Sequence, residues 1–147
     1  MPLKANTTGV ANSAIGYRAL YSNTTGTGNF AAGREALRSN TTGGNNFGMG
    51  YFALYSNVSG SYNIGIGTSA LQNNTTSNNL AVGNNAALNN TTGSVVAVGC
   101  EALKANTTGV ANTAIGYRAL YSNTTSTGNF AAGREALRSN TTGGKVS

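Results

Sequence analysis

The chain has very few side chains that could perform acid–base or metal chemistry. Its 147 residues include no histidine and no aspartate. The carboxylates are Glu35, Glu101 and Glu135, and the single thiol is Cys100. General acid–base catalysis, a catalytic triad and a zinc site each need several such groups to converge. We therefore expect no catalytic residues, no metal site and no cofactor, and we expect that the protein is not an enzyme.

Tyrosine is the side chain best suited to contact a partner. Six tyrosines form three pairs with members four residues apart: Tyr17 and Tyr21, Tyr51 and Tyr55, and Tyr117 and Tyr121. Tyrosine brings a large contact area to a surface at low conformational entropy cost. We predict these six as candidate surface contacts. The alternative is that they stack with arginines of neighbouring repeats, where Arg18 and Glu35 would also lie above one another.

The chain is basic, with nine Lys and Arg residues and a net charge of +6. Charged residues make up only 8% of the sequence, and the cations are spread along its length. A nucleic-acid partner normally requires a dense basic patch, so we expect none. The sequence also has no run of 18 apolar residues, so we expect no insertion into a membrane.

A glycine recurs at a nearly constant spacing along the whole chain. The spacings are 17, 17, 17, 16, 16, 17 and 17 residues, and the glycines are Gly16, Gly33, Gly50, Gly67, Gly83, Gly99, Gly116 and Gly133. A short period sustained throughout is typical of a solenoid in which each repeat forms one coil. We predict one repeat array over residues 1–147, with a partial coil 1–15, coils starting at residues 16, 33, 50, 67, 83, 99 and 116, and a partial coil 133–147.

A second, longer period lies above the first. Residues 3–44 recur as residues 103–144, with Thr113 in place of Ser13 and Ser126 in place of Gly26. Six coils therefore make one larger repeat, which indicates a recent duplication.

Each coil combines a turn sequence with a short strand candidate. The turn reads Asn-Thr-Thr-Gly or a close variant, as at residues 40–43, and both asparagine and glycine favour turns. In the strand candidate, alternation places Phe30 and Ala32 on one face, with Ala31 and Gly33 on the other. We predict that the face with the larger side chains is the inner one. The opposite face carries Ala or Gly, so we predict close packing of another backbone or chain there, with the eight glycines as close-packing positions.

The coils have little apolar material with which to stabilise a lone chain. An Ala-Leu pair such as Ala36-Leu37 follows each glycine, and we predict that it is buried in a bent strand or a short turn. About three large apolar side chains per coil are a small gain against the entropy cost of ordering the coil. Association in a closed ring would bury more. The predicted fold is all-β, a β-solenoid or β-roll of 16–17-residue coils assembled as an intimate homotrimer.

The motif Asn-Thr-Ala-Ile-Gly-Tyr-Arg-Ala-Leu-Tyr-Ser-Asn-Thr-Thr-Ser at residues 112–126 resembles the repeats of bacterial and phage tail-fibre-type proteins. Its Ala-Ile-Gly core is also similar to the head repeats of YadA-like trimeric autotransporter adhesins. The resemblance covers essentially the whole chain. It implies a trimeric β-solenoid at the tip or shaft of a surface fibre, and therefore an extracellular location on a cell or a virion.

Three functions of different kinds agree with these patterns. The first is a structural or adhesive segment of an extracellular trimeric fibre, with a host-surface or glycan receptor as its partner. The second is a flat, repetitive surface that binds ice or glycan through columns of Thr and Asn, with the threonines at Thr24, Thr41, Thr75, Thr91 and Thr107. The third is a glycosylated coat, because the Asn-x-Ser/Thr acceptor pattern recurs at the corners.

Overall fold

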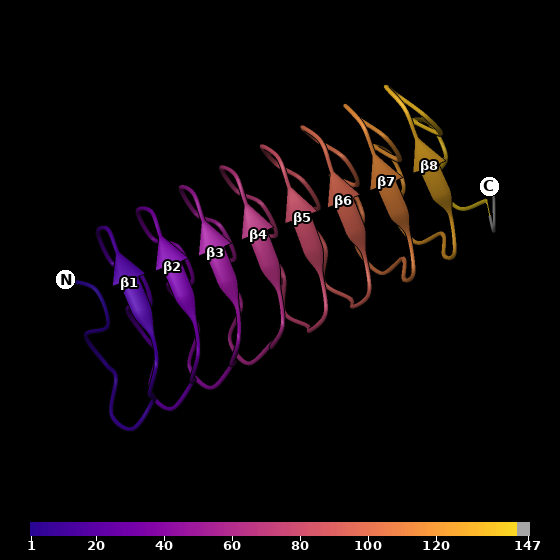
Figure 1. Cartoon of the computed structure of the whole chain (residues 1–147). Coiled ribbons are helices and arrows are strands. Elements are labelled where there is room, and N and C mark those ends of the chain that lie inside the picture. The colour runs from indigo at the N-terminus through magenta and orange to yellow at the C-terminus, as the bar shows by residue number, and fades with distance from the viewer. Residues whose placement is uncertain (144–147) are drawn as a thin grey trace.

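The computed structural model describes residues 1–143 as a β-solenoid that winds along a single axis (Figure 1). Each coil contributes one three-residue strand, and no helix occurs in the described residues. The strands are β1 (Ser13–Ile15), β2 (Phe30–Ala32), β3 (Phe47–Met49), β4 (Ile64–Ile66), β5 (Leu80–Val82), β6 (Val96–Val98), β7 (Thr113–Ile115) and β8 (Phe130–Ala132). The prediction of an all-β solenoid is confirmed. The end of the predicted partial coil 133–147 lies outside the described residues.

The strands form one parallel sheet in which each strand pairs with the next one in sequence. The register keeps equivalent residues of successive coils together, as Phe30 pairs with Phe47 and Ala31 with Gly48. The sheet therefore runs along one side of the solenoid, and each sequence position forms a column along its length (Figure 1). These columns determine what each face of the protein presents to a partner.

The prediction of which strand face points inward is wrong. The central Ala or Gly of each strand from β2 to β8 is buried, whereas the flanking larger residues are partly or largely exposed. The leucine of the Ala-Leu pair fills the space beneath the sheet. A Cβ added to Gly48 would lie 3.2 Å from the Leu37 Cγ atom, so only a small residue fits between strand and leucine. The Ala/Gly face is thus the interior of the chain and is not available to another chain.

The Ala-Leu segment is a turn and not a bent strand. Leu37 has a left-handed φ of 51°, which normally costs a residue with a side chain about 1–2 kcal/mol. This conformation sends the Leu37 N–H to the Ala53 carbonyl of the next coil at 2.9 Å and buries the side chain completely. Every coil from Leu20 to Leu120 repeats the arrangement at its buried leucine or, in one coil, at Ala87.

The glycine column lies where each strand ends and the turn begins. Gly33 has a φ of +139°, and a Cβ there would be 2.5 Å from the Gly50 carbonyl oxygen. The glycines at the start of the other coils up to Gly116 show the same close approach to the following coil. The spacing of 16–17 residues therefore reflects a place where two backbones pass with no room for a side chain.

Two columns of asparagine run through the corners of the solenoid and are almost completely buried. The corner column comprises Asn23, Asn40, Asn57, Asn74, Asn90, Asn106 and Asn123, and the pre-strand column comprises Asn29, Asn46, Asn63, Asn79, Asn112 and Asn129. In the corner column, Asn57 Nδ2 donates to Asn40 Oδ1 at 3.0 Å and to the Gly60 carbonyl at 2.8 Å. Such bonds give the buried amide and carbonyl groups the hydrogen-bond partners that water cannot supply inside the solenoid.

Val95 interrupts the pre-strand column. In the regular coils the asparagine side chain accepts the main-chain N–H of the next asparagine, as Asn29 Oδ1 does from Asn46 N at 3.0 Å. With valine at 95, the Asn112 main-chain N–H makes no hydrogen bond in the described part of the chain.

We expect Val95→Asn to raise the free energy of unfolding by about 1 kcal/mol, because it restores an acceptor for this buried N–H. Urea unfolding measures the change. Val96→Asn on the exposed sheet face is the matched control and should not stabilise the protein. A lower stability for Val95→Asn would show that the valine packs better than the ladder bonds.

Candidate functional site

The six predicted contact tyrosines lie in the turns that follow the strands, on one side of the solenoid. Tyr17, Tyr51 and Tyr117 are exposed, and Tyr21, Tyr55 and Tyr121 are half-buried. Four of the arginines lie in the same columns, because the period places Arg34 between Tyr17 and Tyr51, Arg38 between Tyr21 and Tyr55, and Arg134 and Arg138 after Tyr117 and Tyr121. Arg18 and Arg118 lie in the adjacent column, which also holds the three glutamates. We call this surface the basic-aromatic stripe. Its first block comprises Lys4, Tyr17, Arg18, Tyr21, Arg34, Glu35, Arg38, Tyr51 and Tyr55, and its second block comprises Glu101, Lys104, Tyr117, Arg118, Tyr121, Arg134, Glu135 and Arg138.

Cations and rings alternate within the first block. The Arg34 Cζ atom lies 5.5 Å from the centre of the Tyr17 ring and 5.8 Å from that of Tyr51. The Arg38 Cζ atom lies 5.4 Å from the Tyr55 ring, and Arg38 also donates a hydrogen bond to the Tyr55 hydroxyl. The tyrosines therefore stack with arginines of neighbouring coils and at the same time form part of the surface. Each such contact restricts an arginine that would otherwise move freely.

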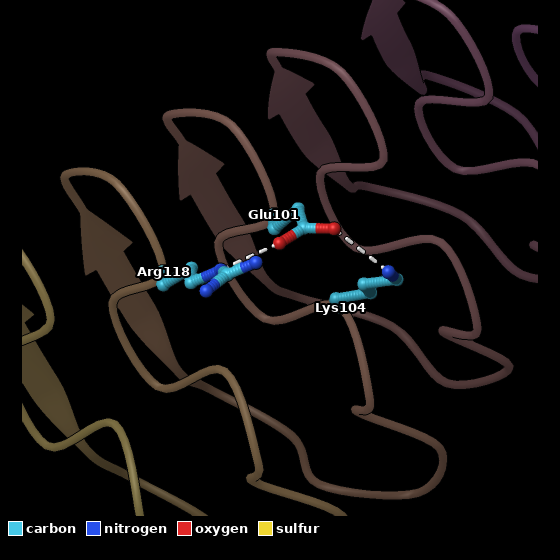
Figure 2. Close-up of polar contacts among 3 residues, drawn as sticks. All are labelled: Glu101, Lys104 and Arg118. Carbon is cyan, nitrogen blue, oxygen red and sulfur yellow. Dashed lines mark hydrogen bonds and ion pairs between the residues drawn. The ribbon is translucent and has the colours of Figure 1, made fainter.

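The second block is built around Glu101 (Figure 2). Lys104 Nζ lies 2.8 Å from Glu101 Oε1, and Arg118 Nε of the next coil lies 2.7 Å from Glu101 Oε2. Hydrogen bonds from Lys104 and Arg118 lower the pKa of the Glu101 carboxyl, and the bond to Glu101 raises the pKa of Lys104. The carboxylate thus neutralises two cations and ties two coils together.

We expect Glu101→Gln to lower the Tm by about 2 °C near neutral pH. The folded-state pKa of Glu101 lies below the unfolded one, so its contribution is present above the unfolded pKa and is lost as the pH falls through the folded pKa. Thermal melts at pH 7 and at pH 3 should therefore differ between parent and variant only at pH 7. Glu135→Gln is the control, because Glu135 makes no ion pair within residues 1–143. A difference that persists at pH 3 would contradict the electrostatic origin.

The first block has no carboxylate in the position of Glu101. Its one acid, Glu35, has an oxygen 3.8 Å from Arg38 Nε, too far for a hydrogen bond, and it makes no ion pair with Arg18. Arg18 and Glu35 occupy equivalent positions of successive coils without forming an ion pair, whereas Arg118, the equivalent of Arg18, pairs with Glu101 of the preceding coil. Lys4 donates to the Tyr21 hydroxyl at 3.1 Å, which lowers the pKa of Tyr21.

A second exposed surface is the outer face of the sheet. Ile15 is 64% exposed, Phe130 51%, and Met49, Ile64 and Ile115 between 41% and 43%. Phe30 and Phe47 stack with ring centres 4.7 Å apart. A shallow hollow of about 380 Å³ lies where two 16-residue coils lack one corner residue, and it is lined by Tyr62, Ile64, Asn78, Asn79, Leu80, Ser94, Val95 and Val96. The alternation in the strand sequences predicted the apolar columns of the first and third strand residues, but we expected these columns to face the interior.

The threonine and asparagine columns are less accessible than the sequence suggested. The Thr24 hydroxyl donates to the Thr41 carbonyl of the next coil at 3.1 Å, and Thr41, Thr75, Thr91 and Thr107 donate in the same way. The asparagines of the corner column are buried, and these are the acceptors of the Asn-x-Ser/Thr pattern. An enzyme that attaches glycans would not reach these amides in the folded protein.

Cys100 is exposed and unpaired, and it replaces the Tyr or Arg of its column. Within residues 1–143 no three His, Cys, Asp or Glu side chains gather as a metal site would require. The same residues contain no helix that is long and apolar enough to cross a membrane.

The geometry defines a parallel β-solenoid repeat protein with a basic-aromatic stripe and an apolar sheet face. No protein-family model, curated protein or solved structure matches the chain. The resemblance to fibre repeats therefore depends on the residues of the motif alone.

Proposed function

We propose that the chain is a non-catalytic structural or adhesive segment of an extracellular trimeric fibre, a cell-surface adhesin or a phage tail fibre. The observation that carries the proposal is the apolar outer face of the sheet, which continues over all eight strands. Soluble monomers rarely expose a long contiguous apolar patch, and such patches usually mark an interaction site. The repeats that resemble those of trimeric fibres give the second line of support.

Association through the sheet face would solve the problem of the thin interior. The buried apolar side chains of a coil are mainly its Ala-Leu pair and the small central strand residue. Three copies with their sheets turned towards a common axis would bury the outer strand residues as well, and a ring of this kind is closed. Parallel, in-register chains would bring Phe30 of the three copies to one height along the axis and Phe47 to the next. The basic-aromatic stripe would remain on the outside.

Light scattering of the purified chain tests the assembly. We expect a mass of roughly 44 kDa, three times the 14.8 kDa of one chain. Ile64→Glu should shift the mass towards that of a monomer, because it places a charge in the proposed interface. Thr68→Glu is the control, since it changes the charge equally but lies in an exposed turn.

A monodisperse monomer that stays folded on heating at low concentration would contradict the fibre. That result would favour the second candidate, a flat surface that binds ice or glycan. Its support is the regular threonine column, in which each hydroxyl lies one coil from the next. Against it, the asparagines are buried and the threonine hydroxyls already donate within the protein.

A further inference from the structure

We propose that the first block of the basic-aromatic stripe binds an acidic polysaccharide, and that the Arg34 guanidinium receives a carboxylate or sulfate group of the polymer. The inference rests on the proposed function to the extent that a fibre would present this stripe to its surroundings.

Arg34 is held in place and yet has no anionic partner. The rings of Tyr17 and Tyr51 flank its guanidinium from the coils before and after it. The Arg34 side chain makes no hydrogen bond and no ion pair in the described residues, and it is exposed. Its N–H donors are therefore free, while stacking limits the conformations of the side chain. A guanidinium restricted in this way binds a planar carboxylate or a sulfate with little further loss of entropy.

The charge of the first block is poorly compensated. Lys4, Arg18, Arg34 and Arg38 face one carboxylate, that of Glu35, which leaves a net charge of +3. In the second block Glu101 takes up both Lys104 and Arg118. The two blocks have nearly the same sequence, so the missing bridge makes the first block the better anion site.

The shape and spacing of the stripe favour a polysaccharide over nucleic acid. The cations are spread over several coils, about 4.8 Å apart, whereas DNA carries one charge for about every 1.7 Å of its axis. Between the charges lie groups that suit sugar hydroxyls. Ser22, Ser39 and Ser56 directly follow residues of the stripe and are partly exposed, and their hydroxyls make no hydrogen bond in the described residues. The Tyr17 and Tyr51 hydroxyls are also unbonded there. A linear polymer with a charge on every sugar or two would match this pattern.

Binding to four polymers tests the proposal, with the full chain in calorimetric titrations. Polygalacturonate carries carboxylates, dextran sulfate carries sulfates, dextran is neutral, and single-stranded DNA carries phosphates. We expect binding to one or both acidic polysaccharides, weakening as salt is added, and none to dextran. Arg34→Gln should weaken that binding about tenfold, because a charge-assisted contact is lost. Arg34→Lys keeps the positive charge but loses the planar guanidinium, so its affinity should lie between those of Arg34→Gln and the parent.

Thr42→Asp is the matched control, because it lowers the net charge by the same amount at an exposed corner away from the stripe. Equal losses of affinity in Arg34→Gln and Thr42→Asp would overturn the proposal. Binding to dextran or DNA as tight as binding to the acidic polysaccharides would also overturn it, and so would the absence of binding to all four polymers. Light scattering of the same samples separates this inference from the fibre. If the chain is a monomer and its binding to an acidic polysaccharide depends on Arg34, the anion site is supported and the trimeric fibre is contradicted.

Discussion

Replacing Gly33 with valine is expected to abolish the stacking of the coils around it, with a loss of more than about 4 kcal/mol in the free energy of unfolding. The Cβ of the new side chain would lie 2.5 Å from the carbonyl oxygen and 2.7 Å from the carbonyl carbon of Gly50. These are backbone atoms, so the clash is relieved only by moving a whole coil. The φ of +139° adds strain, because residues with a side chain rarely adopt it.

The effect should spread along the array, because each coil of a solenoid is stabilised only by its neighbours. Far-ultraviolet circular dichroism during urea unfolding would show a lower midpoint and a less cooperative transition. Gly116→Val, where the Cβ would lie 2.4 Å from the Gly133 carbonyl oxygen, should behave alike. Thr41→Ser is the control, since serine keeps the hydroxyl that donates to the Val58 carbonyl. Valine variants that melt together with the parent would refute the close approach of the backbones.

Asn57→Asp is expected to destabilise the protein by about 3 kcal/mol at neutral pH although the side chain hardly changes shape. The Asn57 amide nitrogen donates to Asn40 Oδ1 and to the Gly60 carbonyl, and both are acceptors. A carboxylate would face these two oxygens with no proton to donate, in a fully buried site. The bonds that Asn57 Oδ1 accepts from Asn63 and Asn74, at 3.4 and 3.3 Å, are too long to offset the loss.

The pH dependence of this variant identifies the cause. Burial among acceptors raises the pKa of the new carboxyl in the folded state, so the penalty grows as the pH rises above the unfolded pKa. Parent and variant should therefore converge as the pH falls to about 4 and the acid gains a proton that it can donate. Asn78→Asp at an exposed corner is the matched control and should be nearly neutral. A loss that does not change with pH would point to packing and not to the missing donors.

The sequence by itself determined the architecture, because a solenoid is a periodic object. The glycine spacing placed every strand, because each strand ends at the residue before a periodic glycine, as at Ile15, Ala32 and Met49. The Asn-Thr-Thr-Gly segments marked the corners correctly, since their turn chemistry is local. The columns of Tyr and Arg also followed from the period, because equivalent residues of a parallel sheet stack in register.

Only the tertiary structure decided what lies inside. Alternation separates two faces of a strand, but it does not say which face is buried, and here Leu37 enters the interior from a left-handed turn that leucine disfavours when alone. That leucine leaves room only for Ala31 or Gly48 and so places Phe30 and Phe47 on the outside. The pairing of Glu101 with Arg118, and the absence of such a pair at Arg34, likewise depends on how side chains of neighbouring coils meet. Which strand face is buried and which charged side chains pair both depend on contacts between neighbouring coils, and the sequence of a single coil does not determine them.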